Sequence, residues 1–339
     1  MADPVSLRTN PQAGDFYHGY IDAPPAAARR RGPALHIALF AATFLTTATA
    51  SAFYQGKDFL ADPAQLLFGF PYAIAIMTIL LFHECGHYFL ARAHHVDASL
   101  PYFIPAPPVP FFIGTLGAFI RMRSMPRDRR ALFDVGAAGP WAGIAVALPI
   151  LALGLQLSEV RPADPGAAGG GLFLGESMLF KAVSWMVLGV SGSDVTVVLH
   201  PVALAGWVGL LVTALNLLPI GQLDGGHVVY AAFGEYWHRW IARGTLTTLI
   251  VLGLGGAFTW LVWAVLLSAI GLRHPNLVDA DTPLDRPRTW AALATIVLFL
   301  VTFMPEPFYS SDPPAPPILR DEHAVPVGAP APADWVIPL

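Results

Sequence analysis

A short run of ionisable residues interrupts an otherwise apolar stretch in the first third of the chain. It reads His83-Glu84-Cys85-Gly86-His87. In a helix, residues at i and i+4 share one face about a turn apart, so both imidazoles project from the same side. The H-E-x-x-H spacing is typical of zinc sites in which both histidines bind the metal and the glutamate is the general base. We therefore expect His83 and His87 to be metal ligands and Glu84 to be the base.

A catalytic zinc ion takes three protein ligands and leaves its fourth position to water. A second stretch at membrane depth offers a carboxylate beside residues that break a helix, namely Asn216 to Gly226, which contains Asp224. Pro219 and Gly221 break a helix there, and non-helical backbone inside a membrane is tolerated only against protein or a water-filled cavity. We expect this broken segment to turn Asp224 toward the histidines as the third ligand. The alternative is a plain helix end, with Asp224 capping the following helix.

The composition sets the class of protein in which these residues lie. Hydrophobic residues make up 55% of the 339 residues, charged residues 12%, and the mean hydropathy is +0.56. Soluble domains carry about 25% charge, so this chain is expected to be a membrane protein. The net charge of −4 gives no nucleic-acid signal. The single cysteine, Cys85, excludes an internal disulfide framework and a cysteine-cluster metal site.

Apolar stretches near the length of about 20 residues that crosses a bilayer predict an all-α polytopic membrane protein with about six transmembrane helices. They cover residues 34–54, 69–91, 133–157, 201–220, 245–271 and 289–304. We interpret residues 245–271 as one tilted helix. The alternative is a hairpin broken at Gly255-Gly256, whose halves would each be too short to span. Residues 177–190 are also too short, and predict an interfacial or re-entrant helix.

Arginines favour one orientation of these helices. They gather at Arg29 to Arg31, between Arg92 and Arg130, and at Arg239 and Arg243. The positive-inside rule places these loops and the N-terminus in the cytoplasm. A single helix over 245–271 would put Arg273, Arg286 and Arg288 on the opposite side, whereas a hairpin would place them with the others.

The domain organisation follows from these spans. We expect a cytoplasmic N-terminal segment over residues 1–33, a transmembrane metalloprotease domain over 34–304 with its core at 69–230, and a Pro-rich, disordered tail over 305–339. The scarcity of lysine beside many arginine, alanine, glycine and proline residues indicates a bacterial source. The expected location is therefore the bacterial cytoplasmic membrane.

A proline-rich segment precedes residues 111–120, where aromatic and β-branched residues favour a strand. We expect a strand or β-hairpin that dips into the membrane beside the active site. Its open edge would pair with an unwound substrate by strand addition. The residues expected to approach the substrate are Gly114, Thr115, Leu116 and Gly117. The alternative is a structural re-entrant loop that only closes the core.

The paired motifs resemble those of the site-2 protease family of intramembrane zinc metalloproteases. That family combines H-E-x-x-H on one transmembrane helix with N-x-x-P-x-x-x-L-D-G on another, found here from Asn216 to Gly225. The stretch from Leu100 to Ser124 looks like the plant and cyanobacterial branch that includes the chloroplast EGY proteins. The resemblance covers about residues 70–310. A proline common within the second motif is replaced here by Gly221 or Gln222, which alters loop stiffness but no ligand.

The resemblance implies one Zn²⁺ per chain and cleavage of peptide bonds within or near transmembrane segments. The expected partners are single-span membrane protein substrates and the lipid bilayer, with no nucleic acid, and the oligomeric state stays open. Asn216 would help to hold the substrate or the oxyanion, with an interhelical hydrogen bond as its alternative role. Gly139 and Gly143 form a G-x-x-x-G pattern, which we interpret as packing of the catalytic core rather than a dimer contact.

Three other classes of protein are compatible with parts of this pattern. A non-catalytic relative would lack the glutamate or a ligand, and none is missing here. A metal or solute transporter would show two-fold internal repeats, and the sequence has none that we detect. A membrane-anchored metalloprotease with a cytosolic site would carry H-E-x-x-H outside the apolar spans.

Overall fold

The computed structural model describes residues 32–108, 113–162, 172–189, 195–275, 277–310 and 336–338. Within these residues, three helices are long and apolar enough to cross a membrane. They are α2 (Ala34–Tyr54), α3 (Phe70–Ala93) with the short helix η2 (Pro63–Gly69) before it, and α4 (Arg129–Gln156). The chain therefore has the character of a polytopic membrane protein, as predicted.

The other helices in the described residues are α5 (Met178–Leu188), α6 (Pro201–Asn216), α7 (Asp224–Leu254), α8 (Thr259–Ile270) and α9 (Arg286–Thr302). The 16 residues of α6 extend about 24 Å, less than the roughly 30 Å of a bilayer core. This helix ends at Asn216, earlier than predicted, because Pro219 and the positive φ of Gly221 follow. The predicted count of six spans is not confirmed.

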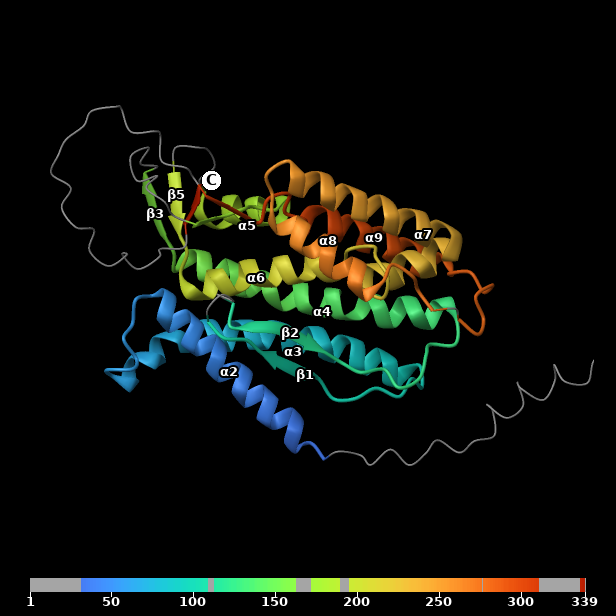
Figure 1. Cartoon of the computed structure of the whole chain (residues 1–339), viewed down its shortest axis with the longest axis horizontal. Helices are drawn as coiled ribbons and strands as arrows, with labels where there is room; N and C mark the ends of the chain where they lie inside the picture. Colours follow the sequence, from blue (N-terminus) through green and yellow to red (C-terminus); the bar gives the residue numbers. More distant parts are fainter. Residues whose placement is uncertain are drawn as a thin grey trace, which may run out of the picture.

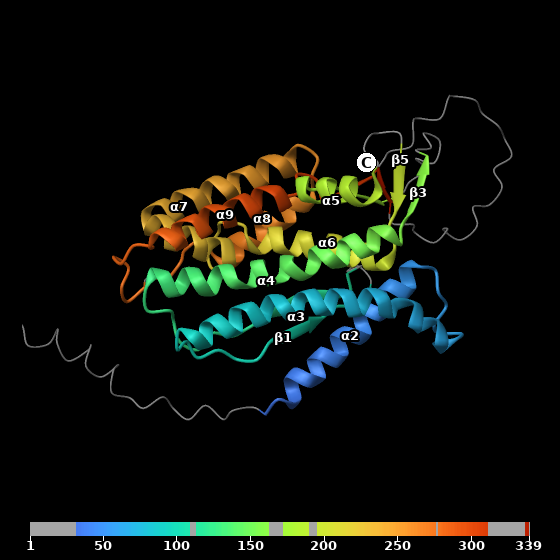
Figure 2. The same cartoon turned by 180° about the vertical axis from the view of Figure 1, so that it is seen from behind.

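Helix α4 lies between α3 and α6 in the centre of the molecule, and it also contacts α7 (Figure 1). Helix α2 crosses obliquely on the other side of α3, beside strand β1 (Tyr102–Pro105; Figure 2). Fully buried apolar side chains, among them Ile76, Leu151, Trp207 and Leu210, fill the space between α3, α4 and α6. The metal-binding motif on α3 is thereby held against the central helix.

The prediction of one tilted helix over residues 245–271 is wrong. Helix α7 ends at Leu254, and α8 begins at Thr259 and packs back against α7. Gly256 turns the chain with φ +122°, a conformation that side-chain-bearing residues rarely adopt. The prediction was wrong because the first arm of this hairpin begins well before residue 245: α7 kinks at Gly234, where φ is +80°, and its second part continues to Leu254.

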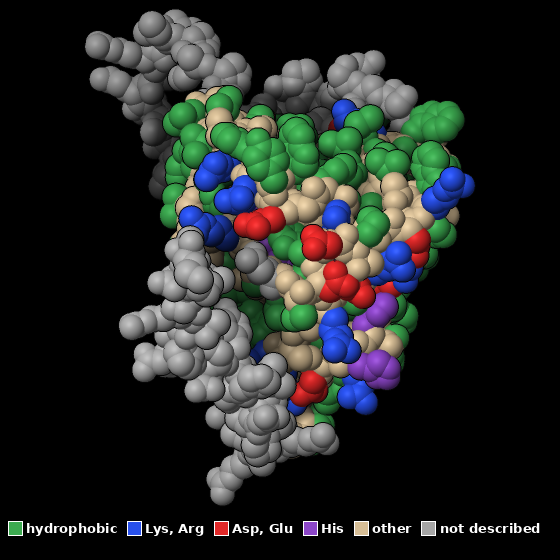
Figure 3. All heavy atoms as spheres, turned by 90° about the vertical axis from the view of Figure 1, so that its right-hand side faces the viewer, with side chains coloured by type: hydrophobic (Ala, Val, Ile, Leu, Met, Phe, Trp, Pro, Cys, Tyr) green, Lys and Arg blue, Asp and Glu red, His purple; other side chains and the backbone are tan. Residues whose placement is uncertain are grey.

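The hairpin also corrects the predicted side of the last arginines. Arg288 pairs with Asp134 near the start of α4 at 2.7 Å, and Arg130 Nε donates to the carbonyl of Pro283 at 3.1 Å. The segment from Arg273 to Arg288 therefore lies at the same end as the arginine-rich start of α4. Figure 3 shows basic and acidic side chains gathered on this end of the molecule.

The predicted β-hairpin is present in the described residues. Strand β1 pairs antiparallel with β2 (Thr115–Phe119), with Tyr102 opposite Phe119. Phe111 and Phe112, which were part of the predicted segment, lie outside the described residues. Strand β2, which contacts α3, therefore has the extended conformation that strand addition requires.

A second, five-stranded sheet was not predicted. In spatial order its strands are β3 (Glu159–Pro162), β5 (Val195–Val198), β7 (Val336–Pro338), β4 (Leu172–Leu174) and β6 (Phe308–Ser310). Two of them belong to the tail that was expected to be disordered, so that expectation is wrong for residues 308–310 and 336–338. They form strands because β4 pairs with β6, and β4 and β5 pair with β7, and local composition alone cannot predict these partners.

Candidate metal centre

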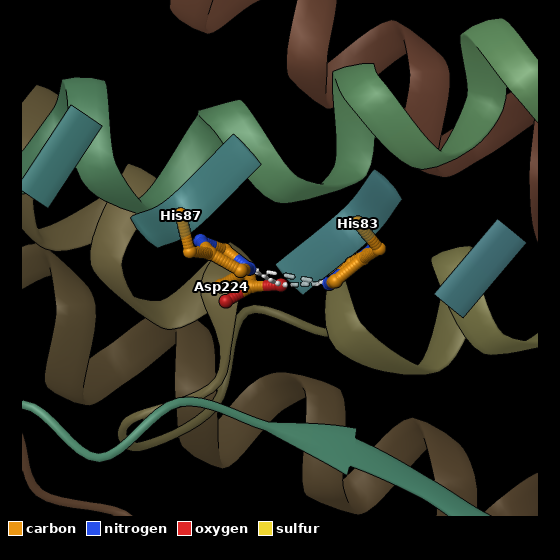
Figure 4. A group of neighbouring side chains, drawn as sticks. All are labelled: His83, His87 and Asp224. Atoms are coloured by element: carbon orange, nitrogen blue, oxygen red, sulfur yellow. Dashed lines mark hydrogen bonds and ion pairs between the residues drawn. The ribbon is translucent and has the colours of Figure 1, made fainter. Parts of the chain in front are cut away.

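Three side chains from two distant parts of the sequence meet beside α4. His83 and His87 project from α3, and Asp224, the first residue of α7, points at both of them (Figure 4). Asp224 Oδ2 lies 3.3 Å from His83 Nε2 and 3.2 Å from His87 Nε2. The two Nε2 atoms are 3.2 Å apart. The broken segment after α6 thus brings the carboxylate to the histidines, as the sequence predicted.

These separations fit a zinc ion. Donor atoms bound tetrahedrally to one zinc at about 2.1 Å lie about 3.4 Å from one another. All three candidate ligand atoms lie within 4.8 Å of each other, and two imidazoles with one carboxylate are donors that zinc accepts. His83 and His87 are 3% and 7% exposed, so a bound ion would be shielded from bulk water on their side.

Helix α4 orients the two histidines. The Nδ1 atom of His87 donates to the carbonyl of Val135 at 2.7 Å, which leaves Nε2 unprotonated and free to bind a metal. A Cβ on Gly139 would lie 2.0 Å from His87 Nε2, and one on Gly143 would lie 3.1 Å from His83 Nδ1. The interpretation that these glycines pack the catalytic core is confirmed.

Glu84 lies beside the cluster without joining it. Its side chain is 4% exposed and borders a cavity of about 190 Å³ together with the three candidate ligands. The backbone amide of Ile120, just after β2, also interacts with its carboxylate. Glu84 can therefore reach a water molecule in this cavity while the two histidines face the metal position.

Asn216, at the end of α6, also borders the cavity. Its side-chain Nδ2 lies 3.1 Å from His83 Nε2, so the amide is adjacent to the position that a metal would occupy. Asn216 is thus one of the residues that the fold brings to the cluster. The sequence singled it out only through its place in the motif.

The four hairpin residues predicted to approach the substrate lie elsewhere. Gly114 packs against α2, where a Cβ would come within 2.6 Å of the Thr46 carbonyl oxygen. Thr115 donates to the carbonyl of Ile104, whereas Leu116 is exposed, and neither these residues nor Gly117 line the cavity. The hairpin residues that do line the cavity are Ala118, Phe119, Ile120 and Met122.

A pair of buried histidines next to the cluster was not predicted as a unit. His227 lines the cavity, and its Nδ1 lies 2.8 Å from Nε2 of His274. His274 donates from Nδ1 to the carbonyl of Pro275 at 2.6 Å, so Nε2 of His274 accepts the proton of His227. Burial lowers the pKa of His274 to about 4, which keeps its ring neutral at neutral pH. The sequence showed His227 close to Asp224, but not that a loop 47 residues later covers it.

Apolar helices around a buried cluster of two histidines and one carboxylate define a polytopic membrane protein with a metal centre inside its helical core. The family model described as Peptidase family M50 matches residues 71–262. That is more than half of the chain, and the chain belongs to this family.

Curated plant proteins are similar over most of the chain. The protein named "Probable zinc metalloprotease EGY1, chloroplastic" is 37% identical over 243 residues in Oryza sativa subsp. japonica and 38% identical over 244 residues in Arabidopsis thaliana. These alignments cover 69% and 68% of this chain but only 40% and 41% of the relatives, so the chain spans about two fifths of their length. "Probable zinc metalloprotease EGY2, chloroplastic" from Arabidopsis thaliana is 30% identical over 248 residues, which cover 71% of this chain and 42% of that relative. No solved structure shows significant similarity.

Proposed function

We propose that this protein is an intramembrane zinc metalloprotease that hydrolyses peptide bonds within or near transmembrane segments of single-span membrane proteins. The observation that carries the proposal is the His83–His87–Asp224 cluster, with donor separations that fit zinc and with Glu84 buried beside it. The family and the names of the EGY relatives support the same chemistry.

His83, His87 and Asp224 would hold one zinc ion, which supplies Lewis acidity and lowers the pKa of bound water. Glu84 takes a proton from the attacking water and passes it to the leaving amine. The side-chain amide of Asn216 is placed to donate to the substrate or to the developing oxyanion. Burial of the cluster excludes bulk water, which strengthens each of these electrostatic interactions.

The open edge of the hairpin is proposed to present the substrate in extended form. The backbone of Arg121 is bonded to Ser99 on the β1 side in both directions, at 3.0 Å and 2.9 Å. Because backbone groups alternate in direction along a strand, those of Ile120 and Met122 face the opposite way, toward the cavity. We therefore move the proposed pairing edge from residues 114–117 to residues 118–122.

A proline at position 122 tests this edge, because the N–H of Ile120 already interacts with Glu84. Met122→Pro removes an N–H on the cavity side, and we expect cleavage to fall up to about tenfold, since a lost hydrogen bond costs up to about 1.5 kcal/mol. Met122→Ala keeps the N–H and should cleave within about twofold of wild type. Zinc content is measured in both proteins to confirm that the site is intact. Wild-type cleavage by Met122→Pro with full zinc would exclude strand addition at this residue.

The location is proposed to be a bacterial cytoplasmic membrane, with the N-terminus and the arginine-rich end in the cytoplasm. Cys85 is partly buried on α3, one residue from Glu84, and is the only cysteine in the chain. A membrane-impermeant thiol reagent should therefore label it faster from the cytoplasmic side than from the other side. Mass spectrometry of intact protein after labelling sealed vesicles of each orientation measures the two rates. Faster labelling from the non-cytoplasmic side would show that the orientation is reversed.

Substrates can be identified with a variant that binds them without cleaving them. Glu84→Gln expressed in native membranes should retain full-length single-span proteins, whose shortened forms appear only with the wild-type enzyme. Quantitative mass spectrometry of co-purified proteins compares the two, with a His83→Ala variant as a control that lacks the metal site. If no membrane protein is shortened in a manner that depends on Glu84, the proteolytic function is wrong.

A further inference from the structure

A second cavity lies between α7 and the end of α8, apart from the metal centre. Its volume is about 390 Å³, and its lining residues are Arg239, Arg243, Ile270, Gly271, Leu272 and Arg273. Gly271 has φ +106° and turns the chain so that Arg273 lines the same space as the two α7 arginines. The Gly271 carbonyl oxygen packs closely against Gly221, where a Cβ would meet it at 2.4 Å. The turn after α8 thus contacts the broken segment before α7 and brings three arginines around one cavity.

The charges around this cavity are largely uncompensated. No carboxylate is among the described residues that line it. Arg239 makes a long contact of 3.7 Å with Glu235, and both side chains are 47% exposed, so this pair contributes little. The guanidinium of Arg243 lies over the ring of Trp240 at 5.2 Å, which leaves its N–H groups free to bind an anion. Three guanidinium groups without a carboxylate favour an oxyanion, and their planar forks match a phosphate group.

The cavity also lies where a membrane surface is expected. Helix α8 has no charged residue from Thr259 to Ile270, and Arg273 is the first charged residue after it. Ile270 is 69% exposed beside the arginines, so it offers an apolar surface to a lipid chain. Trp237 and Trp240 are 57% and 54% exposed within the same two turns of α7 as the two arginines. Exposed tryptophans beside arginines are typical of the headgroup level of a bilayer.

We propose that this cavity binds a phosphate group, carried by an anionic phospholipid whose acyl chains lie along Ile270. The arginines contact the phosphate, and the apolar end of α8 contacts the lipid chain. A soluble phosphate compound would use the same arginines but would gain nothing from the exposed apolar wall. The proposal concerns lipid binding and does not depend on the proteolytic function.

The test compares lipids retained by full-length protein purified from equal mixtures of phosphatidylglycerol and phosphatidylcholine. Native mass spectrometry should show bound phosphatidylglycerol in the wild type. In the triple variant Arg239→Gln/Arg243→Gln/Arg273→Gln, we expect binding to weaken about fivefold for each arginine removed. The control variant Arg92→Gln/Arg127→Gln/Arg286→Gln removes the same charge from exposed arginines outside the cavity and should retain the lipid. If the triple glutamine variant is not monodisperse, Arg243→Gln and Arg273→Gln are measured singly.

Three results decide the proposal. Selective loss of phosphatidylglycerol in the cavity variant supports a phospholipid site. Displacement of the lipid from wild-type protein by millimolar inorganic phosphate, but not by chloride at equal ionic strength, supports a phosphate site that a soluble compound also occupies. Equal retention in the cavity variant and the wild type, or equal loss in both triple variants, overturns the proposal, because the arginines would then act only as general surface charge.

Discussion

Replacement of Glu84 by Gln is expected to lower the rate of peptide hydrolysis by about 10²- to 10⁴-fold, the usual contribution of a general base. Glutamine has nearly the same shape but cannot take a proton from water. The zinc content should stay near one ion per chain, because the Glu84 side chain lies beside the three candidate ligands rather than among them. Metal analysis of purified protein and a cleavage assay with a trapped substrate measure the two quantities.

Variants of the ligands should behave in the opposite way. Asp224→Ala removes one of three donors that lie 3.2 to 3.3 Å apart, so both bound zinc and activity should be lost. His83→Ala and His87→Ala should give the same result. If Asp224→Ala kept full zinc and full activity, Asp224 would not be the third ligand. If Glu84→Gln lost zinc, Glu84 would have to be reassigned from base to ligand.

The candidate site could be predicted from the sequence because its information is local. His83 and His87 are one helical turn apart, and that spacing alone places two imidazoles on one face. Asp224 could be predicted because Pro219 and Gly221 mark a broken helix at the end of an apolar stretch, where a carboxylate has few other roles. In both cases residue type and short spacing identify the donor groups, and the packing of α3, α4 and α7 then brings them together.

The supporting groups could not be predicted because they depend on how helices pack. The Val135 carbonyl that orients His87 is a backbone group that any residue could supply. His274 reaches His227 only because the chain turns back at Gly256, a turn that the length of residues 245–271 did not predict. The hairpin was predicted, but the part of it that faces the cavity depends on register, which a slip of a few residues changes.

Substituting the glycines of α4 should disturb the metal site in proportion to the space that each one provides. In Gly139→Ala the new Cβ would lie 2.0 Å from Nε2 of His87, whose ring is held by its bond to Val135. The ring must then move away from the metal position. We expect zinc affinity to fall by about 10- to 100-fold, which is the usual effect of losing a group that orients a metal ligand. Activity should fall with it. Zinc titration against a competing chelator gives the affinity.

Two matched glycine substitutions complete the series. Gly143→Ala places its Cβ 3.1 Å from His83 Nδ1, a contact that a small shift relieves, so zinc affinity should fall by less than in Gly139→Ala. Gly244→Ala, in α7, meets nothing within 4 Å. It should keep wild-type zinc affinity and gain about 0.5–1 kcal/mol of stability, because alanine is the better helix former. Equal zinc affinity in all three variants would mean that contacts from α4 do not position the two imidazole rings. The metal ligands would then be positioned by α3 and α7 alone.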